Sequence, residues 1–260
     1  MKNTNAVQRL YEICMKVFSD EGEIPPPPAI ARLKAVLDGM KPPDVGLDEN
    51  EENEEERRTN TYLGPSKRRK LSRNTAASDL FPPQPFRYPP DITYVHIHEC
   101  DSFSMGIFCL PKSAVIPLHN HFGMTVLSKV LYGSMHVLAY DWYDQHQWYP
   151  EHFGGMSLAK LKVDTVYNAS SGSSVLYLTK GGNIHSFTAL TSCAVLDVLS
   201  PPYADGEPSY YSIHPYSGLH WKEYKDDNEY EDCVWLEEIE KPHYFNVKGQ
   251  AYKGPIIEVI

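Results

Sequence analysis

The sequence predicts a mainly β protein, a barrel or sandwich of short strands that follows two short amphipathic helices. Short runs rich in β-branched and aromatic residues begin after residue 80, and Gly, Pro and Asp separate them. No long helical pattern interrupts the series, which disfavours a βαβ architecture. The runs are 94–100, 103–110, 125–132, 135–142, 158–166, 175–179 and 193–199. Gly133 and Ser134 lie between two of them, in the manner of a hairpin turn.

Two apolar stripes precede the β-rich region and predict helices within residues 1–40. The first recurs at three- and four-residue steps and consists of Val7, Leu10, Tyr11, Cys14, Val17 and Phe18. Thr4 or Asn5 is placed to cap its start, and Gly22 follows its end. The second consists of Ile30, Leu33, Val36, Leu37 and Met40. Pro28 suits the opening of this helix, where its missing N–H costs little. We expect both helices to dock on the barrel and to carry no chemistry.

Residues 41–79 are predicted to form a disordered, charged linker because they contain few large apolar side chains. Residues 44–56 hold eight acidic side chains and no basic one, whereas residues 57–73 hold seven basic side chains and no acidic one. The basic cluster Lys67, Arg68, Arg69 and Lys70 resembles a monopartite nuclear localisation signal. It predicts a protein shared between nucleus and cytoplasm, and the alternative is a solvated run of charge.

Composition excludes several classes of protein. The 260 residues carry a formal net charge of −10 and are 42% hydrophobic, as in a soluble globular protein. No run approaches the roughly 18 apolar residues of a membrane span, and the N-terminus leads into an amphipathic segment unlike a secretory signal. Five cysteines without tight spacing indicate reduced thiols. A net acidic chain is also a poor candidate for DNA binding. We therefore expect neither a membrane nor a nucleic acid as a direct partner.

Three of the eleven histidines predict a metal site. His119 and His121 are two residues apart after an apolar run, and side chains at this spacing share one face of a strand. His185 follows a flexible Gly181-Gly182 pair about sixty residues later. Two imidazoles from one strand and a third from a distant strand are suited to hold one metal ion.

Glycines frame these histidines and distinguish them from the pair His96 and His98, which has the same spacing. Gly106 and Gly133 flank the first two histidines as in the first cupin motif, and Gly182 precedes His185 as in the second. His96 and His98 lack this frame, so we interpret them as surface residues or as residues behind the site.

The frame departs from the commonest cupin pattern at one position. Thr125 stands where that pattern has a ligating glutamate, and no acidic residue occurs between His121 and Asp141. Three neutral imidazoles leave a divalent ion with its full charge, and they suit Fe, Zn, Cu or Ni. An anionic thiolate is a natural further ligand for such a cation.

Three segments identify a family. Residues 117–124, 133–137 and 197–203 resemble the plant cysteine oxidases, which are thiol dioxygenases related to cysteamine dioxygenase. The resemblance covers roughly residues 80–260 and also the two stripes near residues 6–47. It implies a cupin-type double-stranded β-helix, a jelly-roll barrel, over residues 80–260.

The resemblance also implies a chemistry. It implies Fe(II) held by His119, His121 and His185, and O₂ added to the thiol of an N-terminal cysteine on a protein, which gives cysteine sulfinic acid. The oxidised terminus would then be arginylated and the protein degraded, so that the enzyme senses oxygen. The implied substrates are ethylene-response transcription factors of the hypoxia pathway.

Two further residues match positions that the family places near iron and substrate. The resemblance implies that Asp197 binds the substrate amine or orients the site, and that Tyr203 is a donor near bound oxygen or substrate. The alternatives are that Asp197 caps a strand and that Tyr203 packs a turn after Pro201 and Pro202.

Substrate choice can also be argued from the residues. No arginine follows Arg87, and Arg is the usual bidentate partner of a carboxylate such as that of free cysteine. The β-region therefore favours peptide substrates, unless Lys129 or Lys180 substitutes for Arg. Two rival interpretations are a metal cupin of different chemistry, which usually keeps the glutamate, and a non-catalytic nuclear cupin. We expect the protein to be a monomer.

Overall fold

The computed structural model describes residues 5–19, 24–48, 88–143, 155–203, 208–216, 230 and 232–259. Most of the predicted linker, with the basic cluster at 67–70, lies outside the described residues.

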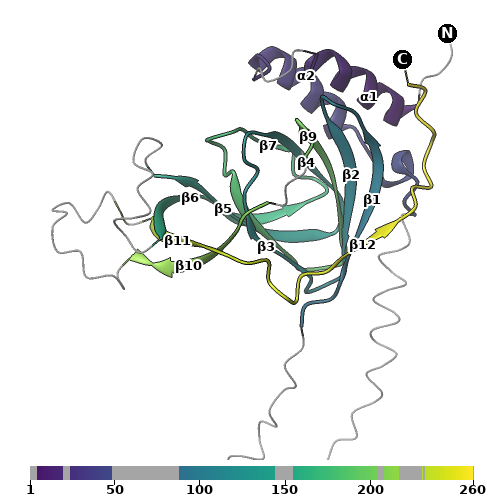
Figure 1. Ribbon diagram of the computed structural model, residues 1–260. Helices are drawn as coiled ribbons and strands as arrows, with labels where there is room; N and C mark the ends of the chain where they lie inside the picture. Colours follow the sequence, from purple (N-terminus) through teal and green to yellow (C-terminus); the bar gives the residue numbers. More distant parts are fainter. Residues whose placement is uncertain are drawn as a thin grey trace, which may run out of the picture.

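The described residues form twelve strands in two six-stranded sheets. The two sheets face each other (Figure 1). The strands are β1 (Ile92–Glu99), β2 (Ser104–Leu110), β3 (Val115–His119), β4 (Thr125–Tyr132), β5 (Ser134–Trp142), β6 (Met156–Asn168), β7 (Ser174–Leu176), β8 (Ile184–Ala189), β9 (Cys193–Ser200), β10 (Tyr210–Pro215), β11 (Cys233–Ile239) and β12 (Val247–Gln250). One sheet has the order β12-β1-β2-β9-β4-β7, and the other has the order β10-β11-β6-β5-β8-β3 and closes on itself. Pairing of Tyr210 with His119 makes this closure. The predicted mainly β, jelly-roll architecture is confirmed.

Two helices, α1 (Ala6–Val17) and α2 (Pro27–Asp38), form where the apolar stripes predict them. Asn5 is the cap of the first helix, because its side-chain oxygen accepts a hydrogen bond from the N–H of Gln8 at 2.7 Å. Pro27 and Pro28 occupy the first two positions of α2. At these positions a helix has no partner for a backbone N–H, so the prolines leave no hydrogen bond unmade.

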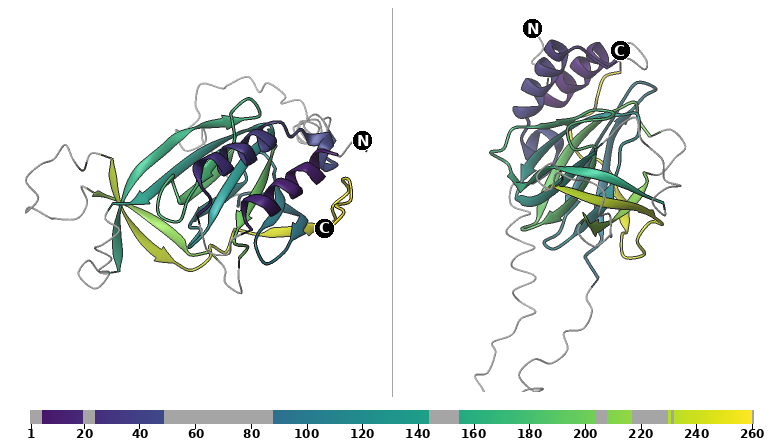
Figure 2. Two further views of the ribbon diagram at one scale, coloured as in Figure 1. Left: turned by 90° about the horizontal axis from the view of Figure 1, so that it is seen from above. Right: turned by 90° about the vertical axis from the view of Figure 1, so that its left-hand side faces the viewer.

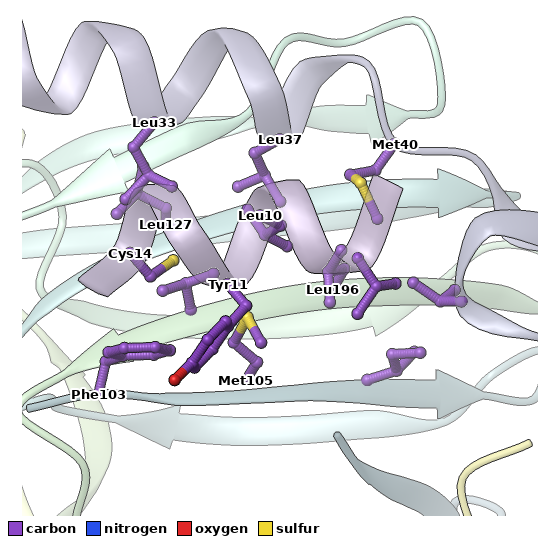
Figure 3. Close-up of a cluster of buried hydrophobic side chains, with 14 of the residues drawn as sticks. Leu10, Tyr11, Cys14, Leu33, Leu37, Met40, Phe103, Met105, Leu127 and Leu196 are labelled. Carbon is purple, nitrogen blue, oxygen red and sulfur yellow. The ribbon is translucent and has the colours of Figure 1, made fainter. Parts of the chain in front are cut away.

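The helices cover the outer face of the sheet that contains β1, β2, β9 and β4 (Figures 1 and 2). Leu10 and Leu33 are almost completely buried and belong to one apolar cluster with Met105, Leu127 and Leu196 of the sheet (Figure 3). Burial of this apolar area holds the helices on the barrel. No helix among the described residues is long and apolar enough to cross a bilayer.

The structured N-terminal part extends past residue 40, where the prediction had ended it. Pro42–Val45 forms a short 3₁₀ helix, and Val45 is 1% exposed in the same apolar cluster. The C-terminal segment joins this layer, because Gln8 exchanges two hydrogen bonds with the backbone of Glu258, at 3.0 Å and 2.8 Å. The docked layer therefore includes Val45, which lies within the acidic stretch, and the C-terminal segment, in addition to the two helices.

Candidate metal centre and its cavity

The structure brings the three predicted ligands together on the inner face of the closed sheet. His119 at the end of β3 pairs with His185 near the start of β8. The ligand atoms of His119, His121 and His185 lie within 4.8 Å of one another, and each side chain is buried, with 6–7% exposed. This cluster contains no carboxylate.

His121 reaches the cluster in a way that the spacing did not predict. We expected both histidines of the first pair to lie on one strand, but β3 ends at His119, and His121 lies in the turn that follows. The alternation of side chains along a strand therefore does not place its ring. Instead, the backbone N–H of His121 donates to the side-chain oxygen of Asn183 at 3.0 Å.

Hydrogen bonds on the outer ring nitrogens orient two of the imidazoles. Nδ1 of His119 donates to the carbonyl oxygen of Pro117 at 2.9 Å, which leaves Nε2 available to a metal. Nδ1 of His121 lies 2.7 Å from the hydroxyl of Tyr203. Nε2 of His121 lies 3.0 Å from Nε2 of His185, inside the cluster.

The cluster keeps its histidines neutral. Burial lowers the pKa of His119 to about 4 and lowers the pKa values of His121 and His185 well below the ordinary value. Desolvation disfavours the imidazolium, so each ring offers a lone pair at neutral pH. Three converging neutral imidazoles fit a divalent transition metal such as iron.

The histidines line a cavity of about 330 Å³ between the two sheets. Phe108, Phe187 and Phe245 give this cavity an apolar, aromatic wall. Apart from the histidines, its polar groups include Asp197 and Tyr203. An apolar cavity with a few converging polar groups is typical of a small-molecule or side-chain binding site.

Asp197 lies in this cavity because of alternation along β9. Its neighbours Leu196 and Val198 belong to the cluster under the helices, so the side chain of Asp197 faces the opposite way. It is 8% exposed, and its Oδ1 atom has no hydrogen-bond partner among the described residues. Burial raises the pKa of Asp197 to about 7, opposed by a hydrogen bond from Ser128. An unpartnered buried carboxylate oxygen favours a cationic ligand.

Tyr203 lies between a metal ligand and solvent, with 37% of its surface exposed. If Nε2 of His121 faces the metal, Nδ1 carries the proton and donates to the hydroxyl oxygen of Tyr203. The Tyr203 hydroxyl then keeps its own proton for another acceptor in the cavity. Burial raises the pKa of this hydroxyl, so it stays protonated at neutral pH.

Comparison with known proteins decides the family. The model of the PCO_ADO family matches residues 36–257. The chain belongs to the PCO_ADO family. Plant cysteine oxidase 1 of Arabidopsis thaliana is 42% identical over 263 residues, which cover 97% of this chain and 80% of that protein. The 2-aminoethanethiol dioxygenase of Mus musculus is 33% identical and covers 66% of this chain and 74% of its own length.

These relatives are thiol dioxygenases, and the predicted enzyme class is confirmed. Among solved structures, an RmlC-like cupin protein from Desulfovibrio desulfuricans is similar at 18% identity with a TM-score of 0.30, over 53% of this chain and 98% of that chain.

In this PCO_ADO chain Lys129 and Lys180, the two lysines that could replace Arg, do not line the cavity. Nζ of Lys129 donates to the carbonyl oxygens of Ala169 and Ser171, at 2.6 Å and 2.7 Å, and the residue does not line the cavity. Nζ of Lys180 lies 5.6 Å from the ring centre of Tyr177. Among the described residues, the cationic side chain that lines the cavity is Lys241, which sequence reasoning missed.

The structure of this PCO_ADO chain also locates Thr125 and the second histidine pair, His96 and His98. Thr125 is not part of the cavity wall, to which Val126 contributes instead. The ring centre of His98 lies 4.9 Å from that of Tyr11, so this histidine packs behind the sheet against α1, while His96 is exposed. Within the described ranges of the chain, the second histidine pair belongs to no cluster of metal-ligating side chains.

Proposed function

We propose that the protein is an Fe(II)-dependent dioxygenase that oxidises the N-terminal cysteine of protein substrates to cysteine sulfinic acid with O₂. The observation that carries this proposal is one cavity that holds three neutral histidines and an unpartnered carboxylate oxygen. Cysteine and 2-aminoethanethiol, which the names of the relatives contain, both pair a thiol with an amine. The cavity has a group suited to each: a cationic centre for the thiolate and Asp197 for the ammonium.

His119, His121 and His185 would hold the iron, and their donor set fits it. Ferrous iron supplies the redox chemistry that activates O₂ toward a thiolate. Asp197 accepts a hydrogen bond from the substrate ammonium and so places the thiol near the histidines. Tyr203 holds the ring of His121 and directs its hydroxyl proton into the cavity. The aromatic wall would surround the reacting thiol with apolar side chains.

A polypeptide end fits this cavity better than free cysteine does. Free cysteine carries a carboxylate, and the described residues of the cavity wall set two acidic side chains, Asp197 and Glu99, against one basic side chain, Lys241. The acidic excess disfavours this additional carboxylate although a lysine is present. A peptide has a neutral amide at that place and needs no cationic partner. The chemistry of the wall therefore supports the N-terminal cysteine of a protein as the substrate.

The proposed partners are O₂ and ethylene-response transcription factors of the hypoxia pathway. Oxidation of their N-terminal cysteine would mark them for degradation through the N-degron route, and the enzyme would act as an oxygen sensor. This part of the proposal rests on the family resemblance, as does action as a monomer.

Mass spectrometry of a Cys-initiated peptide tests the proposal. With iron-loaded protein and O₂ we expect a gain of about 32 Da, the mass of two oxygen atoms, and no gain without O₂. The same peptide with N-terminal Ser is the matched control and stays unchanged. Faster turnover of free cysteine than of the peptide would contradict the proposed substrate. Bound iron without oxidation of either thiol would instead favour a metal cupin of other chemistry or a non-catalytic binding protein.

We also propose that the cluster Lys67, Arg68, Arg69 and Lys70 directs the protein to the nucleus, with a share in the cytoplasm. A fluorescent reporter fused to residues 41–79 should accumulate in the nucleus, and the same reporter with all four residues changed to Ala should not. Equal distribution of the two reporters would refute the signal.

A further inference from the structure

One metal ligand, His121, lies on a turn, and the side chain of Asn183 bonds both the N–H and the carbonyl oxygen of this ligand. His121 is outside β3, so no strand pairing holds its backbone in register with β8, which carries His185. Asn183 lies two residues before His185 and contacts His121 from the other side of the site. Asn183 therefore links the backbone of one ligand directly to the segment that carries another, in addition to the bonds between Asn120 and Ser209 and between Tyr203 and the His121 ring.

The side-chain amide of Asn183 forms two hydrogen bonds with the backbone of His121. Its Oδ1 accepts from the N–H of His121 at 3.0 Å, and its Nδ2 donates to the carbonyl oxygen of His121 at 3.0 Å. The same Nδ2 donates to the carbonyl oxygen of Tyr177 at 2.8 Å. The side chain is 7% exposed. This paired contact replaces the hydrogen bonds that strand pairing would have supplied.

Asp141 in turn anchors the segment that carries Asn183. Its carboxylate accepts from the backbone N–H groups of Gly181, Gly182 and Asn183, at 3.1, 2.8 and 3.2 Å. Both glycines have positive φ, +91° and +82°, a backbone conformation that glycine adopts without strain. A Cβ atom on Gly182 would lie 2.7 Å from the Cβ of Ala139, so the segment lies directly on β5.

We propose that Asn183 is a positioning residue for the metal ligand His121, and that Asp141 is the anchor that holds Asn183 in place. The inference rests on the three histidines being a metal site, and it goes beyond the proposed reaction. Aspartate cannot replace Asn183, because a carboxylate has no N–H to donate and would face the carbonyl oxygens of His121 and Tyr177. Residues behind a metal site act on affinity through the ligands that they orient.

Binding of Co²⁺ to the metal-free protein tests this without substrate or O₂. We expect Asn183→Ala and Asn183→Asp to weaken Co²⁺ binding by about 10- to 100-fold, and Asp141→Asn to weaken it in the same direction. The Co²⁺ absorption spectrum of the Asn183 variants should resemble that of His121→Ala. Asn168→Asp is the matched control, because the Asn168 side chain caps an exposed turn through the N–H of Ser170, at 2.8 Å. Its affinity should equal that of the wild type.

A double-mutant cycle separates positioning from general stability. If Asn183 acts through His121, adding Asn183→Ala to His121→Ala causes no further loss of affinity. Additive losses, or wild-type affinity in folded Asn183 and Asp141 variants, would overturn the proposal. Asn183→Asp keeps the side-chain volume, so its Co²⁺ affinity is the value to compare if Asn183→Ala does not fold. If no variant at either position folds, the two residues support the barrel as a whole and the proposal fails. Because the readout is metal binding, absence of thiol oxidation by the wild type would refute the proposed function and leave this inference standing.

Discussion

His185→Ala is expected to remove bound iron and to abolish thiol oxidation, and His119→Ala to do the same. In the proposed site each residue supplies one of three neutral nitrogen ligands, and the cluster contains no carboxylate that could replace it. Loss of a residue behind a metal site typically costs about 10- to 100-fold in affinity, so loss of a ligand should cost at least about 100-fold. Metal analysis of the purified variants, together with peptide turnover, measures both effects.

His136→Ala is the matched control for this experiment. His136 is a histidine of the same barrel, but its ring lies at the surface, 2.6 Å from a carboxylate oxygen of Asp164. The variant should keep its iron and its activity. Normal iron content and normal turnover in His119→Ala or His185→Ala would contradict the ligand assignment.

The second large effect is expected from Asp197→Asn, which keeps the shape of the side chain and removes its charge. Hydrogen bonds to charged groups contribute about 1.5–3 kcal/mol, which corresponds to a fall of about 10- to 150-fold in kcat/KM. The variant should lose this factor on a peptide with a free N-terminal amine. An N-acetylated Cys peptide should react equally slowly with both proteins. Unchanged kcat/KM on the free-amine peptide would remove Asp197 from substrate binding.

The acid side of the pH profile should report the same group. Burial raises the pKa of Asp197 to about 7. Below its pKa the carboxyl is neutral and loses its attraction for the ammonium, so kcat/KM should rise with pH as the group ionises. A cation bound nearby favours the carboxylate, which puts the midpoint at or below pH 7. Asp197→Asn should lack this rise of kcat/KM. If both proteins show the same rise on the acid side of the profile, another group causes it.

Local patterns predicted the elements whose burial is strongly one-sided. The stripes containing Leu10 and Leu33 have one apolar face and became the docked helices. The runs around Leu127 and Leu196 became central strands of the helix-covered sheet. Strands β10, β11 and β12 were not predicted: exposed residues interrupt β10, all four residues of β12 are exposed, and in β11 the apolar run is followed at once by Glu237 and Glu238.

The clustering of the three histidines was predicted from the sequence, and the contacts that support the cluster were not. Histidine spacing and the glycine frame identified three side chains that the structure brings together. Strand alternation gave the wrong reason for His121, because hydrogen bonds from a residue 62 positions away hold it. Lys129 was a plausible cavity cation on sequence grounds, yet its position in β4 turns it away from the cavity. Such long-range contacts arise from the pairing of distant strands, which a local pattern does not contain.

In the proposed reaction, the protein adds both atoms of one O₂ to the thiol of an N-terminal cysteine. The most direct measurement is the mass of a Cys-initiated peptide after reaction with iron-loaded protein under ¹⁸O₂. We expect a gain of about 36 Da, because both oxygen atoms of the sulfinic acid come from O₂. A gain of about 34 Da would mean that one atom came from water and would contradict a dioxygenase. A disulfide product, or no change in mass, would contradict it as well.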